Sequence, residues 1–207
     1  MSLLIYQAIS NGYDKPTPPK GLSARVDYQL ILGQVNPENG ALWNRYHKIA
    51  APPDWCDQSL YLDGNIGLNA PPIAIEAMID GALGNADIAM MKHPERKCAY
   101  VEIEACLGRG KITDKEARIA HAKLTEIGLP KNYGLWACGV IARRSRAEWL
   151  SDLQHEWFEL CKLVCRDQLW LTAALYKLRN RIPASRVATI DMNIWKNPYF
   201  TYARHKA

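Results

Sequence analysis

Short apolar runs alternate with longer stretches of helical spacing throughout this chain of 207 residues. The runs that we expect to form strands lie close to the N-terminus and at residues 27–32, 43–49, 59–63, 86–91, 135–142 and 187–191. The expected helices cover residues 71–83, 98–107, 113–127, 147–164 and 167–178. This alternation favours an α/β fold with a largely parallel sheet. The length predicts one domain, which we assign to residues 1–207.

The most explicit helix signal lies at residues 113–127. Thr113 can cap the N-terminus, and Glu116 stands three residues later, as in a capping box. Gly128 is placed to end the helix.

The composition supports a folded chain, because 48% of the residues are apolar. No apolar run approaches the length of a membrane span, and the opening residues lack the pattern of a secretion signal. Six cysteines have neither Cys-x-x-Cys nor zinc-ligand spacing; they are Cys56, Cys98, Cys106, Cys138, Cys161 and Cys165. We therefore expect reduced, buried thiols in a cytoplasmic protein without an integral membrane segment.

The formal net charge of +5 indicates an anionic ligand, weak nucleic-acid binding or simple solubility, without deciding among them. A nucleotide diphosphate would be one such ligand. The sequence carries no recognised nucleic-acid-binding motif, so we expect no nucleic-acid partner.

The segment Ser59–Leu68 carries the most chemical information. It reads as an apolar strand that ends on Asp63, Gly64 and Asn65 and then resumes. Two oxygen ligands at the end of a strand suit a hard cation such as Mg²⁺ or Mn²⁺, with substrate phosphates completing its coordination. The alternative is a plain hairpin turn, since Asp-Gly-Asn also has good turn chemistry. In open α/β sheets ligands bind at the carboxyl ends of strands, where Asp63 is expected to stand.

Further motifs follow one another in a specific order along most of the chain. The first two are Ile5–Asp14, which ends in Gly-Tyr-Asp, and Tyr61–Ile66. The third is Lys92–Glu102, which contains the pattern His-Pro-x-Arg-x-Cys-x-Tyr-x-Glu. The last two are Gly128–Arg143 and Arg166–Leu169, of which the second contains Arg-Asp-Gln. Together these segments resemble a GT-A-like glycosyltransferase family that was formerly catalogued as a domain of unknown function. The family occurs in bacterial polysaccharide loci and in plant Golgi proteins.

The resemblance implies a GT-A-like fold, with a mixed, mostly parallel sheet flanked by helices. It also implies transfer of a sugar from a nucleotide-diphosphate sugar to a glycan or other acceptor, assisted by Mn²⁺ or Mg²⁺. The chain departs from better-known GT-A enzymes at Asn65, where they carry a second Asp. A neutral ligand weakens metal binding, so strict metal dependence stays open.

The same resemblance assigns the donor site. Ala8 and Ile9, with the loop that follows them, would hold the base and ribose; Tyr13 would stack on the base and Asp14 would accept its hydrogen bonds. Asp63 would contact both the diphosphate and the metal. For Tyr13 and Asp14 the alternative is a surface turn.

Two further segments complete the predicted donor and acceptor sites. His93 and Arg96 would bind a sugar hydroxyl and the diphosphate, or would form only a solvated loop. Glu102 would point into the cleft or lie on a wet helix face. Trp136 and Gly139 would line the acceptor side, with core packing as the alternative for Trp136.

The resemblance makes Asp167 and Gln168 the catalytic candidates. Asp167 would bind donor-sugar hydroxyls or act as a base, and Gln168 would lie near the reacting carbon. The structural alternative for Asp167 is a helix cap. His205 would complete the metal site with Asp63 and Asn65, or belong to a frayed tail.

Two other functions remain open at this point. One is a non-catalytic module with a degenerate GT-A fold that binds nucleotide sugar or glycan, which the neutral Asn65 favours. The other is a basic protein associated with nucleic acid, which only charge and aromatic content support.

Overall fold

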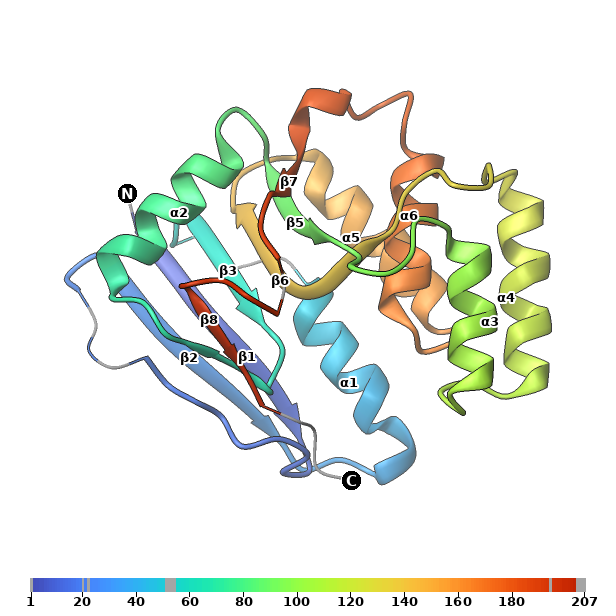
Figure 1. Ribbon diagram of the computed structural model, residues 1–207, viewed down its shortest axis with the longest axis horizontal. Helices are drawn as coiled ribbons and strands as arrows, with labels where there is room; N and C mark the ends of the chain where they lie inside the picture. Colours follow the sequence, from blue (N-terminus) through green and yellow to red (C-terminus); the bar gives the residue numbers. More distant parts are fainter. Residues whose placement is uncertain (1, 20, 22, 51–54, 194, 204–207) are drawn as a thin grey trace.

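The computed structural model describes residues 2–19, 21, 23–50, 55–193 and 195–203. A six-stranded sheet runs through it, with helices on both faces (Figure 1). In spatial order the strands are β2 (Val26–Gly33), β1 (Leu3–Ser10), β3 (Gln58–Leu62), β6 (Trp136–Arg144), β5 (Ile88–Lys92) and β7 (Val187–Ile190). Within this sheet only β6 runs against the others, since it pairs antiparallel with both β3 and β5. The expectation of a mixed, mostly parallel sheet flanked by helices is confirmed.

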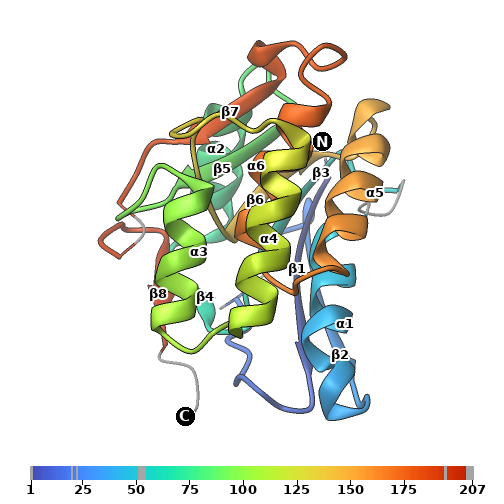
Figure 2. The same cartoon turned by 90° about the vertical axis from the view of Figure 1, so that its right-hand side faces the viewer.

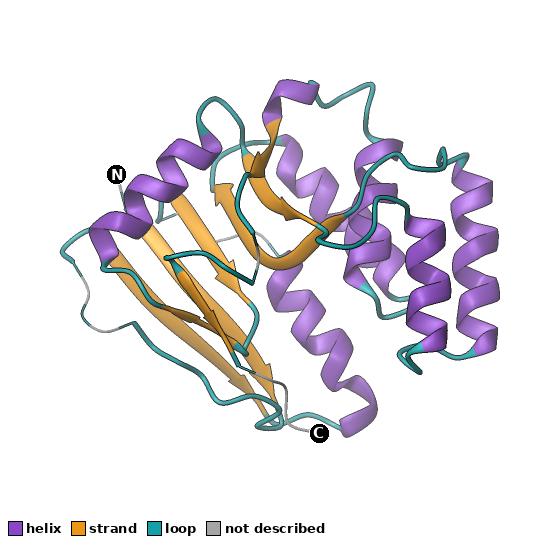
Figure 3. Ribbon diagram, in the orientation of Figure 1, coloured by secondary structure: helices purple, strands orange, loops and turns teal. Residues whose placement is uncertain are grey.

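Helices divide between the two faces of the sheet (Figure 3). One face carries α2 (Pro72–Leu83) and a small antiparallel sheet of β4 (Ile66–Leu68) and β8 (Phe200–Tyr202). The other face carries α1 (Pro37–Ile49), α5 (Trp149–Cys161) and α6 (Asp167–Lys177). Beyond α6 stand α3 (Ala99–Gly108) and α4 (Asp114–Ile127), side by side in Figure 2. Among the described residues, no helix has both the length and the apolar character needed to cross a membrane.

The central strands β1, β3, β5 and β6 are largely buried on both faces, and their side chains alternate between two cores. Along β1, Leu4 and Tyr6 belong to the core under α5 and α6, whereas Leu3 and Ile5 belong to the core under α2. This alternation is the two-residue period of a strand. Because helices cover both sides, all eight residues of β1 are buried.

The strand predicted at residues 43–49 is wrong, because this segment is the second half of α1. Pro37 stands in the first turn and Glu38 follows it, which is a typical helix start that the aromatic residues downstream obscured. The rings of Trp43 and His47, four residues apart, contact each other at a tilt of 58°, with centroids separated by 4.2 Å. The correction matters for the site, since residues three apart share a helix face but point to opposite faces of a strand.

The capping box predicted for α4 is confirmed. The Thr113 side chain accepts a hydrogen bond from the Glu116 backbone N–H at 3.2 Å, and the Glu116 carboxylate accepts from the Thr113 N–H at 2.7 Å. Gly128 follows with a left-handed φ of 71°. Local sequence chemistry therefore sets both ends of this helix.

Replacing the capping side chain in Thr113→Ala is expected to lower the free energy of unfolding by about 1 kcal/mol. Urea denaturation measures the change. Thr125→Ala is the matched control, because the Thr125 hydroxyl donates to the His121 carbonyl within the helix and caps nothing. Its loss is expected to stay within about 0.5 kcal/mol. Equal losses in both variants would contradict a stabilising capping box.

Candidate functional site

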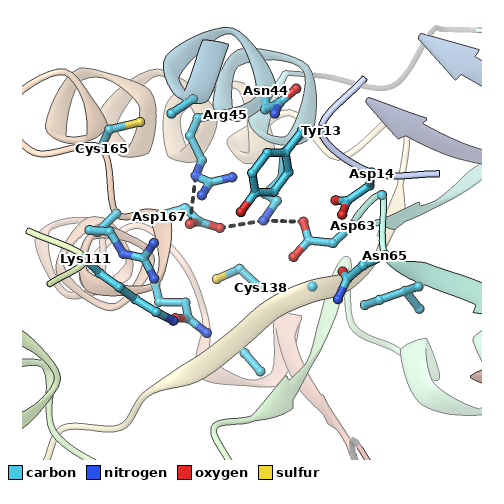
Figure 4. A pocket seen from close by; sticks show the side chains of 18 of the residues that line it. Tyr13, Asp14, Asn44, Arg45, Asp63, Asn65, Lys111, Cys138, Cys165 and Asp167 are labelled. Atoms are coloured by element: carbon cyan, nitrogen blue, oxygen red, sulfur yellow. Dashed lines mark hydrogen bonds and ion pairs between the residues drawn. The ribbon is translucent and has the colours of Figure 1, made fainter. Parts of the chain in front are cut away.

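A pocket of about 840 Å³ opens where β1 and β3 end, between α1 and the N-terminus of α6 (Figure 4). Most residues expected from the sequence line it, namely Ala8, Tyr13, Asp14, Asp63, Asn65, His93, Arg96, Glu102, Gly139, Asp167 and Gln168. Its position at the carboxyl ends of parallel strands is the usual place for a ligand in an α/β sheet.

Three residues expected at the site are not among the described residues that line the pocket. Ile9 packs against the turn at Gly64, where an added Cβ would lie 2.8 Å from the Ile9 Cγ1. Trp136 packs against the hydrophobic core, which is the alternative considered for it, and its buried indole N–H has no partner among the described residues. His205 lies outside the described residues.

The segment after β3 forms a tight turn that aims Asp63 into the pocket. The Ile66 N–H donates to the Asp63 carbonyl at 2.9 Å, and the buried Gln7 amide donates to the carbonyls of both residues at 3.0 and 2.9 Å. The Asp63 N–H in turn donates to the Gly139 carbonyl on β6 at 2.8 Å. Since β4 pairs with β8 rather than with β3, this segment is a turn but not a hairpin.

A chain of ion pairs forms the floor of the pocket (Figure 4). The Lys48 Nζ lies 2.7 Å from Asp63 Oδ1 and 2.7 Å from Asp167 Oδ2. The Arg45 Nε lies 2.9 Å from the other oxygen of Asp167. Lys48 and Arg45 lie three residues apart on α1, so helical geometry presents both to the pocket. Asp167 is the first residue of α6, and its carboxylate faces these two cations.

The ion pairs keep Lys48 and Asp167 charged although both side chains are buried. Burial by itself lowers the pKa of Lys48, but the attraction of Asp167 and Asp63 outweighs it, so that the pKa is raised. Burial by itself raises the pKa of Asp167, but Arg45, Lys48 and Arg166 hold it well below its usual range. The pocket floor is thus a fixed array of two cations and two carboxylates.

Residues behind the floor hold Lys48 in position. The buried Arg143 on β6 donates to the Lys48 carbonyl and to the Tyr6 hydroxyl, both at 2.7 Å. The Tyr61 hydroxyl donates to Asp63 Oδ1 at 3.0 Å, and the Tyr61 ring lies beneath the Lys48 ammonium, 5.2 Å from it. Lys48 is therefore held at its backbone by Arg143, and its ammonium group is held by the two carboxylates and the Tyr61 ring.

The loop after β5 forms one wall of the pocket. His93 Nδ1 accepts the backbone N–H groups of Glu95 and Arg96 at 3.2 and 3.1 Å, and burial lowers the pKa of His93. The Arg96 guanidinium pairs with Glu95 and with the buried Glu102. Arg96 is thus already neutralised by two carboxylates, and Glu102 points to Arg96 rather than lying on a wet helix face.

The side chains around Asp63 leave few ligands for the expected Mg²⁺ or Mn²⁺. Asp63 Oδ1 already accepts hydrogen bonds from Lys48 and Tyr61, and the Asn65 Nδ2 donates to the Ala203 carbonyl at 3.0 Å. Within the described part of the chain, no three His, Cys, Asp or Glu side chains converge as a metal site. Because an ammonium group already sits against the carboxylate that would bind the metal, this donor set does not fit a resident divalent cation.

Several lining residues were absent from the sequence prediction, among them Arg45, Lys48, Lys111, Arg166 and Trp195. A helical interpretation of residues 37–49 would have placed Arg45 and Lys48 on one face. Arg166 directly precedes the predicted Asp167, and its buried Nε has no partner among the described residues. Trp195 is 62% exposed, and nothing in its local sequence indicates the pocket.

Comparisons with known proteins identify the fold. No protein-family model and no curated protein sequence matches the chain. Among solved structures, the apo structure of the bifunctional glycosyltransferase WbbM matches 91% of this chain and 38% of its own, with 11% identity and a TM-score of 0.51. Apo mouse xyloside xylosyltransferase 1 matches 94% of this chain and 89% of its own, with 10% identity and a TM-score of 0.46. The chain spans well under half of the WbbM structure, and the likeness shows a glycosyltransferase-like fold.

Removing the central cation should destabilise the protein strongly. Lys48→Met is expected to lower the free energy of unfolding by about 3 kcal/mol or more, because it leaves the buried Asp167 carboxylate undercompensated. Lys162→Met is the matched control, since Lys162 pairs with Glu159 at the surface and both side chains are 45% exposed. Its cost should not exceed about 1 kcal/mol. Similar losses on urea denaturation would contradict the importance of the buried pair.

The lowered pKa of Asp167 predicts a pH dependence of stability. Because the carboxyl of the unfolded chain takes up its proton at a higher pH than that of the folded protein, the stabilisation is complete above about pH 5 and is lost as the pH falls towards the folded pKa. In Asp167→Asn the slope of unfolding free energy against pH should fall there by up to about 1.4 kcal/mol per pH unit. Asp152→Asn, which removes an exposed pair with Arg181, should leave the slope nearly unchanged. If unfolding free energy changed with pH as steeply in Asp167→Asn as in the wild type, the pH dependence could not be assigned to Asp167.

Proposed function

We propose that this chain transfers a sugar from a nucleoside-diphosphate sugar to a glycan or other acceptor, and that the reaction takes place in this pocket. The observation that carries the proposal is the convergence of Asp63 and Asp167 in one pocket of a glycosyltransferase-like fold. Segments from Ala8 to Tyr202 line the pocket, which supports a single functional unit.

The loop after β1 is proposed to hold the nucleobase. Asn11 and Gly12 have left-handed φ angles of 53° and 62°, so the chain turns sharply there. The turn brings Tyr13 and Asp14 to the pocket, and the Tyr13 ring is 53% exposed. A half-exposed ring offers a face for a base to stack on, and the neighbouring carboxylate can accept hydrogen bonds from a base or ribose.

Arg166 and Lys111 are proposed to contact the diphosphate. Both line the pocket, and neither forms a carboxylate ion pair with another described residue. A guanidinium presents paired N–H donors to phosphate oxygens, and an ammonium adds a point charge. Arg96 is less suited to this role than the sequence indicated, because Glu95 and Glu102 already neutralise it.

Asp167 and Gln168 are proposed to bind the donor sugar near its reacting carbon. The ion pairs of Asp167 support a binding role over a general-base role, because a carboxylate with a depressed pKa accepts a proton poorly. Gly139 makes room for the Asp63 and Ile66 side chains, since an added Cβ would lie 3.2 and 3.0 Å from their nearest atoms. It is proposed to line the acceptor side, as it lines the pocket.

Trp195 replaces Trp136 as our candidate for the acceptor side. It lines the pocket, and its ring meets Tyr202 edge to face at 5.3 Å. The exposed indole offers an apolar face for a sugar ring, whereas Trp136 is partly buried against the core.

A binding module without transferase activity is the second candidate. The observation that favours it is the pairing of Asp167 with two cations, which leaves its carboxylate without the basicity of a catalytic base. Nucleotide-sugar binding without transfer or donor hydrolysis would support this candidate.

Isothermal calorimetry with UDP, GDP, CDP and ADP tests the donor site first. One diphosphate is expected to bind, and the corresponding nucleotide sugar is then tested for hydrolysis and for transfer to a panel of sugar acceptors. If the folded protein bound none of the four nucleotides, the proposal would be overturned.

Arg166→Met is expected to weaken binding of that diphosphate at least tenfold, because a charge-assisted contact is lost. Arg146→Met provides the matched control, since its side chain is 76% exposed and Arg146 does not line the described pocket. Binding by the control should equal that of the wild type. Undiminished binding by Arg166→Met would remove Arg166 from the donor site.

A further inference from the structure

The environment of Lys48 differs from that of an ordinary surface lysine. Its side chain is 2% exposed and lies between two carboxylate oxygens at equal distances of 2.7 Å. The Tyr61 ring and the hydrogen bond from Arg143 to the Lys48 carbonyl limit its movement. A long flexible side chain has thus been held as a fixed point charge between two acids.

The charges at this point already balance. Asp63 and Asp167 carry two negative charges, and Lys48 and Arg45 carry two positive charges within 2.9 Å of them. One divalent cation would supply the same charge. A metal placed between the two carboxylates would have to displace the buried ammonium and leave it without a partner, at a large cost.

The second residue of the Asp-x-Asn motif brings no negative charge that would attract a metal. Asn65 is neutral, and its Nδ2 donates to the Ala203 carbonyl next to β8. The side-chain N–H of Asn65 therefore links the turn after β3 to the small sheet. Asp63 is the single carboxylate of this motif, and its Oδ1 faces Lys48.

We propose that the Lys48 ammonium takes the place of a divalent cation in this site, so that the chain binds its nucleotide donor without a metal ion. The proposal rests on the function proposed above. Lys48 and Arg45 neutralise the two carboxylates, which keeps the pocket from repelling an anionic ligand. The diphosphate is then met by Arg166 and Lys111, which line the same pocket. Positive charge on protein side chains offsets the charge that develops on the leaving diphosphate.

The first experiment measures Mn²⁺ alone, so that it does not depend on the proposed function. Free Mn²⁺ is titrated by electron paramagnetic resonance with the wild type, Lys48→Ala and Lys48→Gln, each checked for folding by circular dichroism. The wild type is expected not to bind Mn²⁺, and the folded Lys48 variants are expected to gain at least tenfold in Mn²⁺ affinity. Lys162→Ala, at an exposed ion pair, should behave as the wild type.

Two results of this titration would overturn the proposal. One is tight Mn²⁺ binding by the wild type, because the ammonium would then not exclude a metal. The other is a folded Lys48 variant that binds Mn²⁺ no better than the wild type, because Lys48 would then not stand in a position that a metal can take.

The second experiment separates this proposal from the proposed function. The calorimetric titration with UDP, GDP, CDP and ADP is run with EDTA and again with Mn²⁺. Dissociation constants that agree within twofold support metal-free binding. Binding at least tenfold tighter with Mn²⁺ overturns the metal-free proposal and leaves the transferase proposal standing. No binding under either condition overturns the transferase proposal, and with it metal-free donor binding.

Discussion

Three elements that are distant in the sequence meet at one ammonium group, because Lys48 on α1 pairs with Asp63 after β3 and with Asp167 at the start of α6. Burying charges costs free energy unless each has a close partner. Here Lys48 and Asp167 each have such a partner, so the pairs specify how α1, β3 and α6 must approach one another. The shape of the pocket follows from that approach.

The antiparallel strand β6 supports the same arrangement from within the sheet. Its Gly139 carbonyl accepts the Asp63 N–H where β3 ends, and its Arg143 side chain binds the last turn of α1 through the Lys48 carbonyl. The residues behind the floor are therefore as constrained as those that face the pocket. Such a shell keeps charged side chains in one geometry without help from a ligand.

Much of the fold could be predicted because its signals are local. The capping box at Thr113 and the glycine after α4 act within a few residues, and the alternating burial of β1 follows from the period of a strand. The interpretation was wrong at residues 43–49, where aromatic residues favoured a strand and the helix start at Pro37 was overlooked. That error removed Arg45 and Lys48 from the predicted site, since a strand would have separated them.

The sequence by itself determined the α/β class, the Asp63 turn at the end of a strand and the acid at the start of α6, because each depends on neighbouring residues. Only the tertiary structure decided what those acids touch. Whether Asp63 faces a metal or an ammonium group depends on the packing of α1 against the sheet, which brings Lys48 to it. Likewise, the packing of Trp136 against the core and the exposure of Trp195 follow from neighbours that are remote in the sequence. Electrostatic and packing partners are set by distance in space, and no local pattern encodes that distance.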